Sequence, residues 1–285
     1  MRAIDVHVHP TDERVVRAWA GDPLDAERFF HGRWTDENLD ATAERYRKLD
    51  AMAVLLGADA ETTTGVPAFP NDELAAACRT HPDVFVGFAG IDPWKGALAV
   101  RELERCVREL GLRGVKLHPG RQAFYPNDRH FYPLFEAAAA LGVPALFHTG
   151  MMAAGAGTPG GRGQRLEYTR PIFLDHLAAD FPELTIIAAH PAWPWADEGL
   201  ALARHKRNVY LDLSGYSPKY IPPPYIQFAN TLLQDQMLFG SDYPFITPER
   251  WLTDFEQAGF RPEVHQKILV DNARRALKLS SATPA

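Results

Sequence analysis

Short runs of apolar and β-branched residues recur along the chain, separated by segments that carry most of the charge. Eight such runs can be distinguished, at residues 3–9, 51–57, 84–91, 114–118, 143–148, 184–190, 209–213 and 236–241. Each run is short and apolar enough to be buried on both faces, which is typical of strands in a parallel sheet. The pattern therefore predicts eight parallel strands.

Amphipathic segments between these runs indicate helices. Residues 96–110 place apolar side chains three and four positions apart, with charges between them. Residues 133–141 are rich in alanine and stop at Gly142, a residue type that often ends a helix. Residues 172–181 and 196–205 have the same helical character.

The repeated alternation of strand and helix favours an α/β fold, a single closed (β/α)8 TIM barrel. The chain of 285 residues suits one such domain over 1–285, since these barrels are typically about 250 residues long. An open doubly wound sheet is the alternative. Its dinucleotide-binding form would need GxGxxG after the first strand, and that motif is absent.

Two connections are long, and both follow strands, which places them at the C-terminal mouth of the predicted barrel. They are residues 10–50, between strands one and two, and residues 149–171, after strand five. The second is rich in glycine, as expected for a lid over an active site. A surface excursion without a function is the alternative.

Charge and cysteine content exclude some classes of protein. The net charge of −6 provides no basic face for nucleic acid. The two cysteines, Cys78 and Cys106, form no CxxC pair, which suits a reducing compartment. No secretory signal and no run of about 18 apolar residues is present. We therefore expect a cytoplasmic protein that does not span a membrane.

Histidines and an aspartate stand where predicted strands end. His7 and His9 are two apart on the first strand, so both side chains point to one side, where they can bind one metal ion. Asp5 has the same parity and is expected one layer deeper. Taken alone, this pair is more often two ordinary histidines on a half-exposed strand.

Three further residues strengthen the metal hypothesis. His148, His190 and Asp242 close strands five, six and eight. The carboxyl ends of all strands meet at one rim of a barrel, where the active sites of TIM barrels lie. We therefore expect these residues to form one metal-dependent active site together with His7 and His9.

Five motifs carry a resemblance to a known family. They are DVHVH at strand one, GVKLHP at strand four, FHTG at strand five, AHPAWPW at strand six and GSDYP at strand eight. With them the chain resembles the amidohydrolase superfamily over residues 3–279. It is most similar to the amidohydrolase-related branch that includes aminocarboxymuconate-semialdehyde decarboxylase and resorcylate decarboxylase.

The resemblance implies a role for each residue of the predicted site. The metal ligands would be His7, His9, His148 and Asp242, and the metal is usually Zn2+, with Mn2+ or another divalent ion as alternatives. His190 would be the catalytic acid or base. Such a ligand set leaves positive charge on the metal and lowers the pKa of a bound water to about 7, and Asp242 can accept a proton from that water.

Other residues near the predicted mouth are candidates for substrate binding. Lys116 and His118 share parity on strand four, and a carboxylated Lys116 would permit a second metal. Arg121 is a candidate anion clamp. Trp193 and Tyr216 suggest a flat, partly aromatic substrate. The alternatives are a packed His118, a solvated Arg121 and aromatic side chains that only hold loops.

Three functions remain open at this stage. The first is a metal-dependent hydrolase, in which metal-activated water attacks a carbonyl and His190 assists proton transfer. The alternative is a non-oxidative decarboxylase of an aromatic or muconate-like acid, in which Arg121 or Arg170 holds the carboxylate while His190 or Asp242 protonates the carbon. The third, of another class, is a non-catalytic metal-binding barrel.

Two longer stretches narrow the hydrolase interpretation. Residues 124–150 and 211–226 resemble members described as 4-hydroxyphenyl-β-ketoacyl-CoA hydrolases. This resemblance implies cleavage of an aryl β-ketoacyl-CoA to an aromatic acid and acetyl-CoA, and the branch implies a homodimer. The loop after strand five carries three arginines against one glutamate, suited to the phosphates of a CoA thioester; they are Arg162, Arg165 and Arg170.

Overall fold

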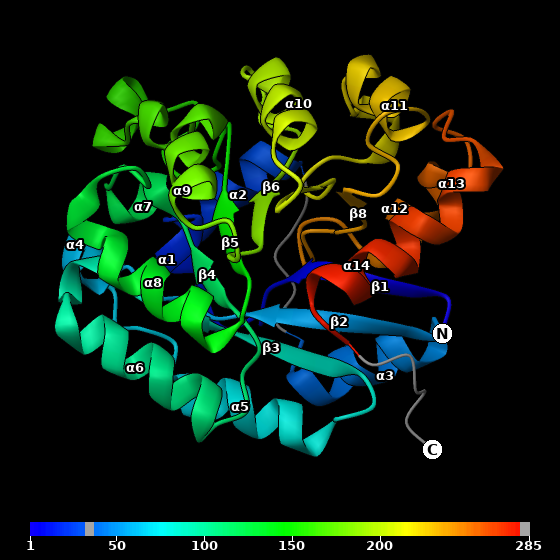
Figure 1. Ribbon diagram of the computed structural model, residues 1–285. Coiled ribbons are helices and arrows are strands. Elements are labelled where there is room, and N and C mark those ends of the chain that lie inside the picture. Colours follow the sequence, from blue (N-terminus) through cyan, green and yellow to red (C-terminus); the bar gives the residue numbers. More distant parts are fainter. Residues whose placement is uncertain (32–36, 280–285) are drawn as a thin grey trace.

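The strands form a barrel in a computed structural model that describes residues 1–31 and 37–279 (Figure 1). They are β1 (Ala3–Val8), β2 (Ala51–Leu56), β3 (Phe85–Gly90), β4 (Val115–Leu117), β5 (Ala145–His148), β6 (Ile186–Ala189), β7 (Val209–Asp212) and β8 (Met237–Leu238). Each strand pairs in parallel with the next, in the order β1 to β8. The segment after β8 returns to β1, because Val6 N–H donates to Phe239 O at 2.9 Å. The predicted barrel is confirmed, and the doubly wound order is excluded.

Helices surround the barrel. The α-helices are α1 (Glu13–Trp19), α2 (Pro23–Phe30), α3 (Leu39–Lys48), α4 (Glu61–Thr64), α5 (Asn71–Thr80), α6 (Ala97–Arg108), α7 (Pro119–Gln122), α8 (Tyr132–Leu141), α9 (Leu174–Asp180), α10 (Ala196–His205), α11 (Pro223–Ala229), α12 (Pro248–Phe255), α13 (Pro262–Gln266) and α14 (Asn272–Ala276). The bounds of α10 coincide with the predicted range, and α8 ends at Gly142 with a φ of 69°. No helix within the described ranges is both long and apolar enough to cross a membrane.

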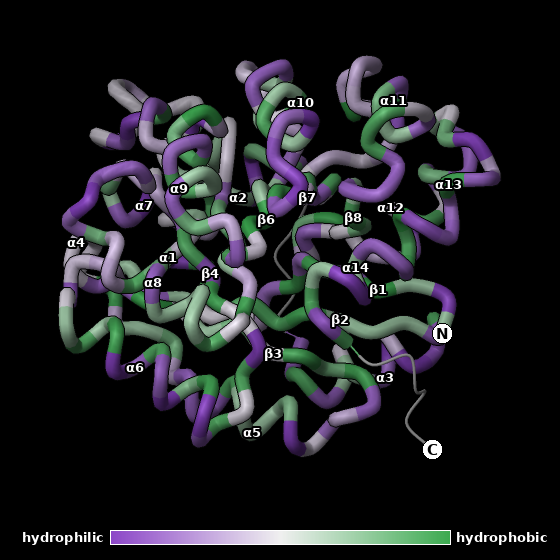
Figure 2. The backbone as a smooth tube through the Cα atoms, in the orientation of Figure 1, coloured by the Kyte–Doolittle hydropathy of each residue, from purple (hydrophilic) through white to green (hydrophobic). Residues whose placement is uncertain are grey.

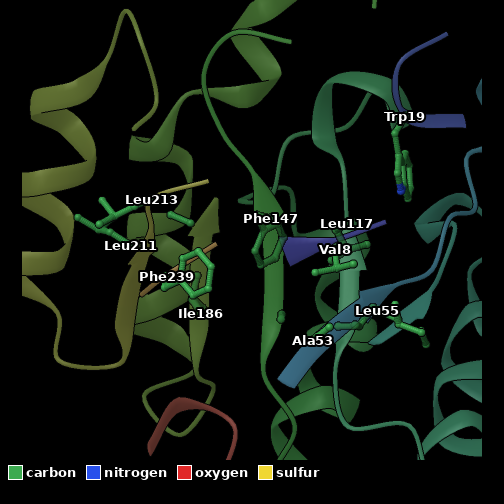
Figure 3. Packing of buried hydrophobic residues seen from close by; sticks show 14 of the residues in the cluster. Val8, Trp19, Ala53, Leu55, Leu117, Phe147, Ile186, Leu211, Leu213 and Phe239 are labelled. Atoms are coloured by element: carbon green, nitrogen blue, oxygen red, sulfur yellow. The ribbon is translucent and has the colours of Figure 1, made fainter. Parts of the chain in front are cut away.

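Alternate strand residues divide the core into two layers. Val54 and Leu56 of β2 belong to a cluster that contains only strand residues and the C-terminal segment around Ala273. Leu55 belongs to the larger cluster, which also contains helix residues such as Leu103. The first layer therefore fills the barrel interior. The second lies between strands and helices, and Figure 3 shows part of it, including Leu55 and Phe147. In Figure 2, strand β3 is mainly hydrophobic, whereas outer helices such as α6 alternate between hydrophobic and hydrophilic residues.

The first strand departs from simple alternation. Asp5 pairs with Ala53 and Val8 with Leu55, so β1 has one extra residue between these pairs. The expected position of Asp5, one layer below His7, is therefore wrong. Its Oδ2 accepts a hydrogen bond from the Tyr46 hydroxyl of α3 at 2.7 Å, on the helix side of the strand. The bulge lets His7 point into the barrel mouth although Asp5 does not.

The long connections pack onto the rim of the barrel. The β1–β2 connection contains α1 to α3, and residues 32–36 within it lie outside the described part of the chain. The β5–β6 connection contains the short helices η3 (Pro159–Gly163), η4 (Leu166–Thr169) and η5 (Pro171–Phe173). Its Arg162 forms an ion pair with the buried Asp25 of α2 at 3.0 Å. A lid function for this loop stays a prediction.

Candidate metal site at the barrel mouth

The five residues at the predicted strand ends lie together. The ring centroids of His7 and His9 are 5.0 Å apart, those of His7 and His190 are 4.9 Å apart, and those of His148 and His190 are 4.6 Å apart. All five side chains, including Asp242, are buried. The structure therefore brings the predicted residues into one cluster.

Backbone geometry directs two of these side chains. His190 has a φ of 71° and Asp242 a φ of 67°. Few residues other than glycine adopt this left-handed conformation, and it costs about 1–3 kcal/mol where the surroundings enforce it. The turn after β8 is held to β1, because Asp242 N–H donates to His7 O at 3.0 Å. Strained residues at strand ends are typical of functional sites.

The separations between donor atoms suit a metal ion. Asp242 Oδ1 lies 3.4 Å from His7 Nε2 and 3.3 Å from His9 Nε2. Two ligands at about 2.1 Å from one Zn2+ with tetrahedral geometry are about 3.4 Å apart. His7, His190 and Asp242 also each offer a ligand atom within 4.8 Å of the others. Geometry thus places His190 among the possible ligands, beside the acid or base role that the resemblance implied.

Two buried ring nitrogens at the site lack hydrogen-bond partners. His9 Nδ1 and His148 Nε2 have no hydrogen-bond partner within the described ranges. A buried polar atom without a partner is costly, by about 1–3 kcal/mol. A metal held by His9 Nε2 and Asp242 would not reach His9 Nδ1, so a polar group of the substrate is the better candidate to relieve this cost.

Asp212 and Ser214 are functional candidates that sequence reasoning missed. Asp212 Oδ2 lies 2.6 Å from His7 Nδ1. The Ser214 hydroxyl donates to the same oxygen at 2.7 Å, and its N–H donates to Oδ1 at 2.9 Å. A carboxylate on the outer nitrogen of a histidine orients that ring for a metal. The sequence feature that could have identified Asp212 is the position of an acidic residue at the carboxyl end of the seventh strand.

Burial sets the protonation of this cluster. Burial lowers the pKa of His7 well below its ordinary value, and the nearby Lys116 lowers it further. Burial raises the pKa of Asp212 to about 8, although the hydrogen bonds from Ser214 oppose this. The imidazole is therefore neutral, as a metal ligand must be. A divalent cation bound to His7 would place a positive charge near Asp212 and so favour the ionised form of its buried carboxyl group.

Burial and neighbouring charges also shift the pKa values of Lys116 and Asp242. Lys116 Nζ lies 3.1 Å from His7 Nε2, and burial lowers its pKa to about 8 against the attraction of Asp242 and Asp212. For Asp242, burial raises the pKa, but the His9 hydrogen bond and the nearby His190 outweigh burial, so the pKa lies below its usual value. Asp242 is thus the most readily ionised acid of the cluster.

His118 forms one wall of the site. Its ring stacks on His148 at 3.8 Å with an interplanar angle of 8°, and on Trp19 at 5.5 Å. The N–H of Arg121 donates to His118 Nδ1 at 3.3 Å. His118 is therefore packed and hydrogen-bonded, as in the alternative given in the sequence analysis. Contact of His118 with substrate stays a prediction.

Three other candidate substrate residues have different surroundings from the five central side chains. Trp193 is 55% exposed, and Tyr216 packs against the outer core layer. Among the described residues, no hydrogen bond, ion pair or ring contact joins either side chain to the five central residues. Arg170 forms an ion pair with Glu198 and lies over the Trp195 ring. It is therefore already paired, and the structure does not bring it to the metal site.

Comparison with known proteins decides the family. A family model described as Amidohydrolase matches residues 4–279, almost the whole chain. The chain belongs to the amidohydrolase family. The resemblance drawn from the five motifs is thereby confirmed for this amidohydrolase.

Curated relatives match this amidohydrolase over part of its length. A γ-resorcylate decarboxylase of Polaromonas sp. (strain JS666) is 35% identical over 106 residues, 35% of this chain and 32% of the relative. A 2-keto-4-carboxy-3-hexenedioate hydratase of Sphingobium sp. (strain NBRC 103272 / SYK-6) is 30% identical over 135 residues, 42% of this chain and 38% of the relative. The matches thus span about a third of these relatives.

Solved structures share the fold over nearly the full chain. An uncharacterized TIM-barrel protein from Bordetella bronchiseptica has a TM-score of 0.80 and 26% identity, covering 98% of this chain and 99% of the other. A dihydroxybenzoic acid decarboxylase from Polaromonas sp. JS666, with bound manganese and the inhibitor 2-nitroresorcinol, has a TM-score of 0.67 and 24% identity, covering 98% of each chain. These likenesses support the barrel architecture of the amidohydrolase.

Proposed function

We propose that this amidohydrolase is a metal-dependent, non-oxidative decarboxylase of a small aromatic or muconate-like carboxylic acid, built as one domain. The observation that carries the proposal is the placement of Asp242 Oδ1 within 3.4 Å of both His7 Nε2 and His9 Nε2. The decarboxylases among the relatives favour this reaction over hydrolysis.

The chain has a complete set of residues for one divalent ion. We assign His7, His9, His148 and Asp242 as ligands of Zn2+ or Mn2+; manganese is bound in the dihydroxybenzoic acid decarboxylase. The ion would supply positive charge against which the substrate carboxylate is held and polarised. Asp212 holds His7 in the orientation that this binding needs.

His190 is the proposed proton donor. In the reaction the bond between the carboxyl group and its neighbouring carbon breaks, the electron pair stays on that carbon, and CO2 leaves. His190, protonated on Nε2 by a proton taken up from solvent, then gives that proton to the carbon, which forms the new C–H bond and leaves His190 neutral. His190 suits this role because Ser214 contacts its Nδ1 and leaves Nε2 directed toward His148, 3.1 Å away.

Hydrolysis is the second candidate, and one observation favours it. The hydratase among the relatives adds water to its substrate, so water chemistry occurs among the matched proteins. The specific proposal of an aryl β-ketoacyl-CoA substrate has weaker support. Two of the three loop arginines are already paired, Arg162 with Asp25 and Arg170 with Glu198. We also propose that the enzyme forms a homodimer and is located in the cytoplasm, whichever of the two reactions it catalyses.

Metal content and turnover, measured on the same samples, test these functions. Wild type, Asp242→Ala and His190→Asn are compared by elemental analysis and assayed with dihydroxybenzoates, simple esters and aryl β-ketoacyl thioesters. We expect about one metal per chain and CO2 release, with metal lost in the first variant. The second variant keeps the metal and loses turnover. A folded, metal-free wild type would overturn the proposal, and turnover of esters or thioesters alone would replace it with hydrolysis.

A further inference from the structure

We infer that a cavity beside the metal site binds a second anionic group of the ligand, a carboxylate or a phosphate. The cavity has a volume of about 470 Å³. The ends of α1, α4 and α7 and the β5–β6 connection line it, and all of these follow strand ends at the barrel mouth (Figure 1). Cavities that bind small molecules have volumes of roughly 300–1,000 Å³.

Arg121 provides the strongest argument, because its charge is buried without an acidic partner. Its side chain lines the cavity and is only 8% exposed. No carboxylate in the described ranges forms an ion pair with it. Arginine is almost never buried unless it is paired. Burial also lowers the pKa of this guanidinium to about 10, as expected for a cation that lacks a counter-ion.

A structural role explains part of this arrangement but not the charge. Arg121 Nε donates to Ala18 O at 2.8 Å and Nη2 donates to Arg17 O at 3.0 Å, at the C-terminal end of α1. Helix-end carbonyls carry only partial negative charge. They hold the guanidinium still and leave its net charge uncompensated. A rigid guanidinium at a cavity wall is suited to a carboxylate or phosphate.

The other charged residues that line the cavity are also mostly positive. Four arginines and a single acidic residue, Asp22, line the cavity. Arg17 pairs with Glu13 and Arg162 with Asp25, so these two are largely neutralised. Arg165 is mostly exposed, and its nearest carboxylate, that of Glu167, is 4.0 Å away. Arg165 is thus only loosely paired, and Arg121, which forms no ion pair with a described carboxylate, carries the uncompensated charge of this lining.

Two successive contacts connect Arg121 of the cavity with the metal site. The backbone N–H of Arg121 donates to His118 Nδ1, and the His118 ring stacks on His148. One ligand can thus have its reacting group at the metal and a second anionic group near Arg121. This inference rests on the proposed function for the identity of the reacting group, whereas anion binding in the cavity can be measured without turnover.

Calorimetric titration of the metal-loaded enzyme tests the inference directly. The probes are inorganic phosphate, benzene-1,4-dicarboxylate and, as the singly charged reference, benzoate. The variants are Arg121→Gln and Arg165→Gln, with Arg207→Gln as a matched control at an exposed arginine outside the cavity. Because Arg121 also holds the end of α1, Arg165→Gln decides the result if Arg121→Gln fails to fold.

We expect phosphate or the dicarboxylate to bind saturably to wild type and to the control. Binding should weaken about tenfold or more in Arg121→Gln, the loss typical of a charge-assisted hydrogen bond, and about threefold in Arg165→Gln. Tighter phosphate binding identifies a phosphorylated ligand, and a preference for the dicarboxylate over benzoate identifies a second carboxylate. Absence of saturable binding, or equal affinity in both variants and the control, would overturn the inference, whether or not the enzyme proves to be a decarboxylase.

Discussion

Ser214 Oγ lies 3.0 Å from His190 Nδ1, and this contact decides which nitrogen of His190 can take part in chemistry. The Ser214 hydroxyl gives its only hydrogen to Asp212 Oδ2, at 2.7 Å. Its oxygen is therefore left to accept from an N–H of His190. Nδ1 carries a hydrogen, and Nε2, which faces His148 at 3.1 Å, is the nitrogen that must take up a proton before the proposed transfer to carbon.

Ser214→Ala should lower turnover without removing the metal. Because His190 loses the partner of its Nδ1, its ring can rotate and exchange tautomers. We expect kcat to fall by about 10–100-fold, the range for loss of an orienting hydrogen bond in a metal site. The measurements are kcat, KM and their pH profiles. The matched control is Ser217→Ala, since Ser217 bonds to Asp254 away from the cluster. An unchanged pH profile of kcat would contradict a positioning role.

Asp212→Asn should weaken metal binding. The carboxylate lies 2.6 Å from His7 Nδ1, and an amide there holds no charge to strengthen the ligand. We expect the metal affinity to fall by about 10–100-fold. Competition with a chromophoric chelator measures this affinity, and Asp242→Ala, which removes a proposed ligand, should lose more. Wild-type affinity in Asp212→Asn would show that His7 needs no orienting carboxylate.

Gly215→Ala should damage the site through His190. Gly215 has a φ of 73°, and a Cβ added there would lie 2.6 Å from His190 Nδ1. Gly65 provides a matched control, because its φ is 68° and an added Cβ would meet no atom within 4 Å. Both variants should lose roughly 1–2 kcal/mol of stability from the left-handed conformation. Only Gly215→Ala should lose turnover, and comparable turnover in the two variants would reject the steric argument.

Asp12→Ala should destabilise the protein in a pH-dependent way. Asp12 begins α1, accepts from Arg14 N–H and forms an ion pair with the Arg14 side chain. The Arg14 hydrogen bond holds the pKa of Asp12 below its ordinary 3.8. The unfolded state therefore binds more protons below pH 3.8, and the contribution of Asp12 is present above that pH and lost as pH falls further.

Urea unfolding at neutral and acidic pH checks this expectation. We expect Asp12→Ala to cost about 1 kcal/mol at pH 7, and less as pH falls below the pKa of Asp12. Asn38→Ala is the control, since Asn38 begins α3 with an uncharged side chain that accepts from Ala41 N–H. Its cost should not change with pH through that side chain. A constant cost for Asp12→Ala would show that its charge contributes nothing.

Local patterns were sufficient to predict most elements of this barrel. Strand β2 and helix α10 were placed to within one residue, because apolar periodicity and flanking turn residues act over short distances. The convergence of His148, His190 and Asp242 was also predictable. Parallel strands put their carboxyl ends at one rim, so the position of a residue at a strand end determines its neighbourhood.

The order of residues along the chain was enough to predict the barrel, its rim and the residue types that meet there. The folded protein was needed to show that Asp5 faces α3 and that Asp212 and Ser214 contact His7 and His190. It was also needed to show that Arg121 holds the end of α1 beside a positive cavity. A one-residue bulge reverses the side on which a residue lies. The partners of the other residues come from segments up to about two hundred positions away. Their contacts depend on how strands and loops pack together, and this packing cannot be predicted from the local pattern of apolar residues.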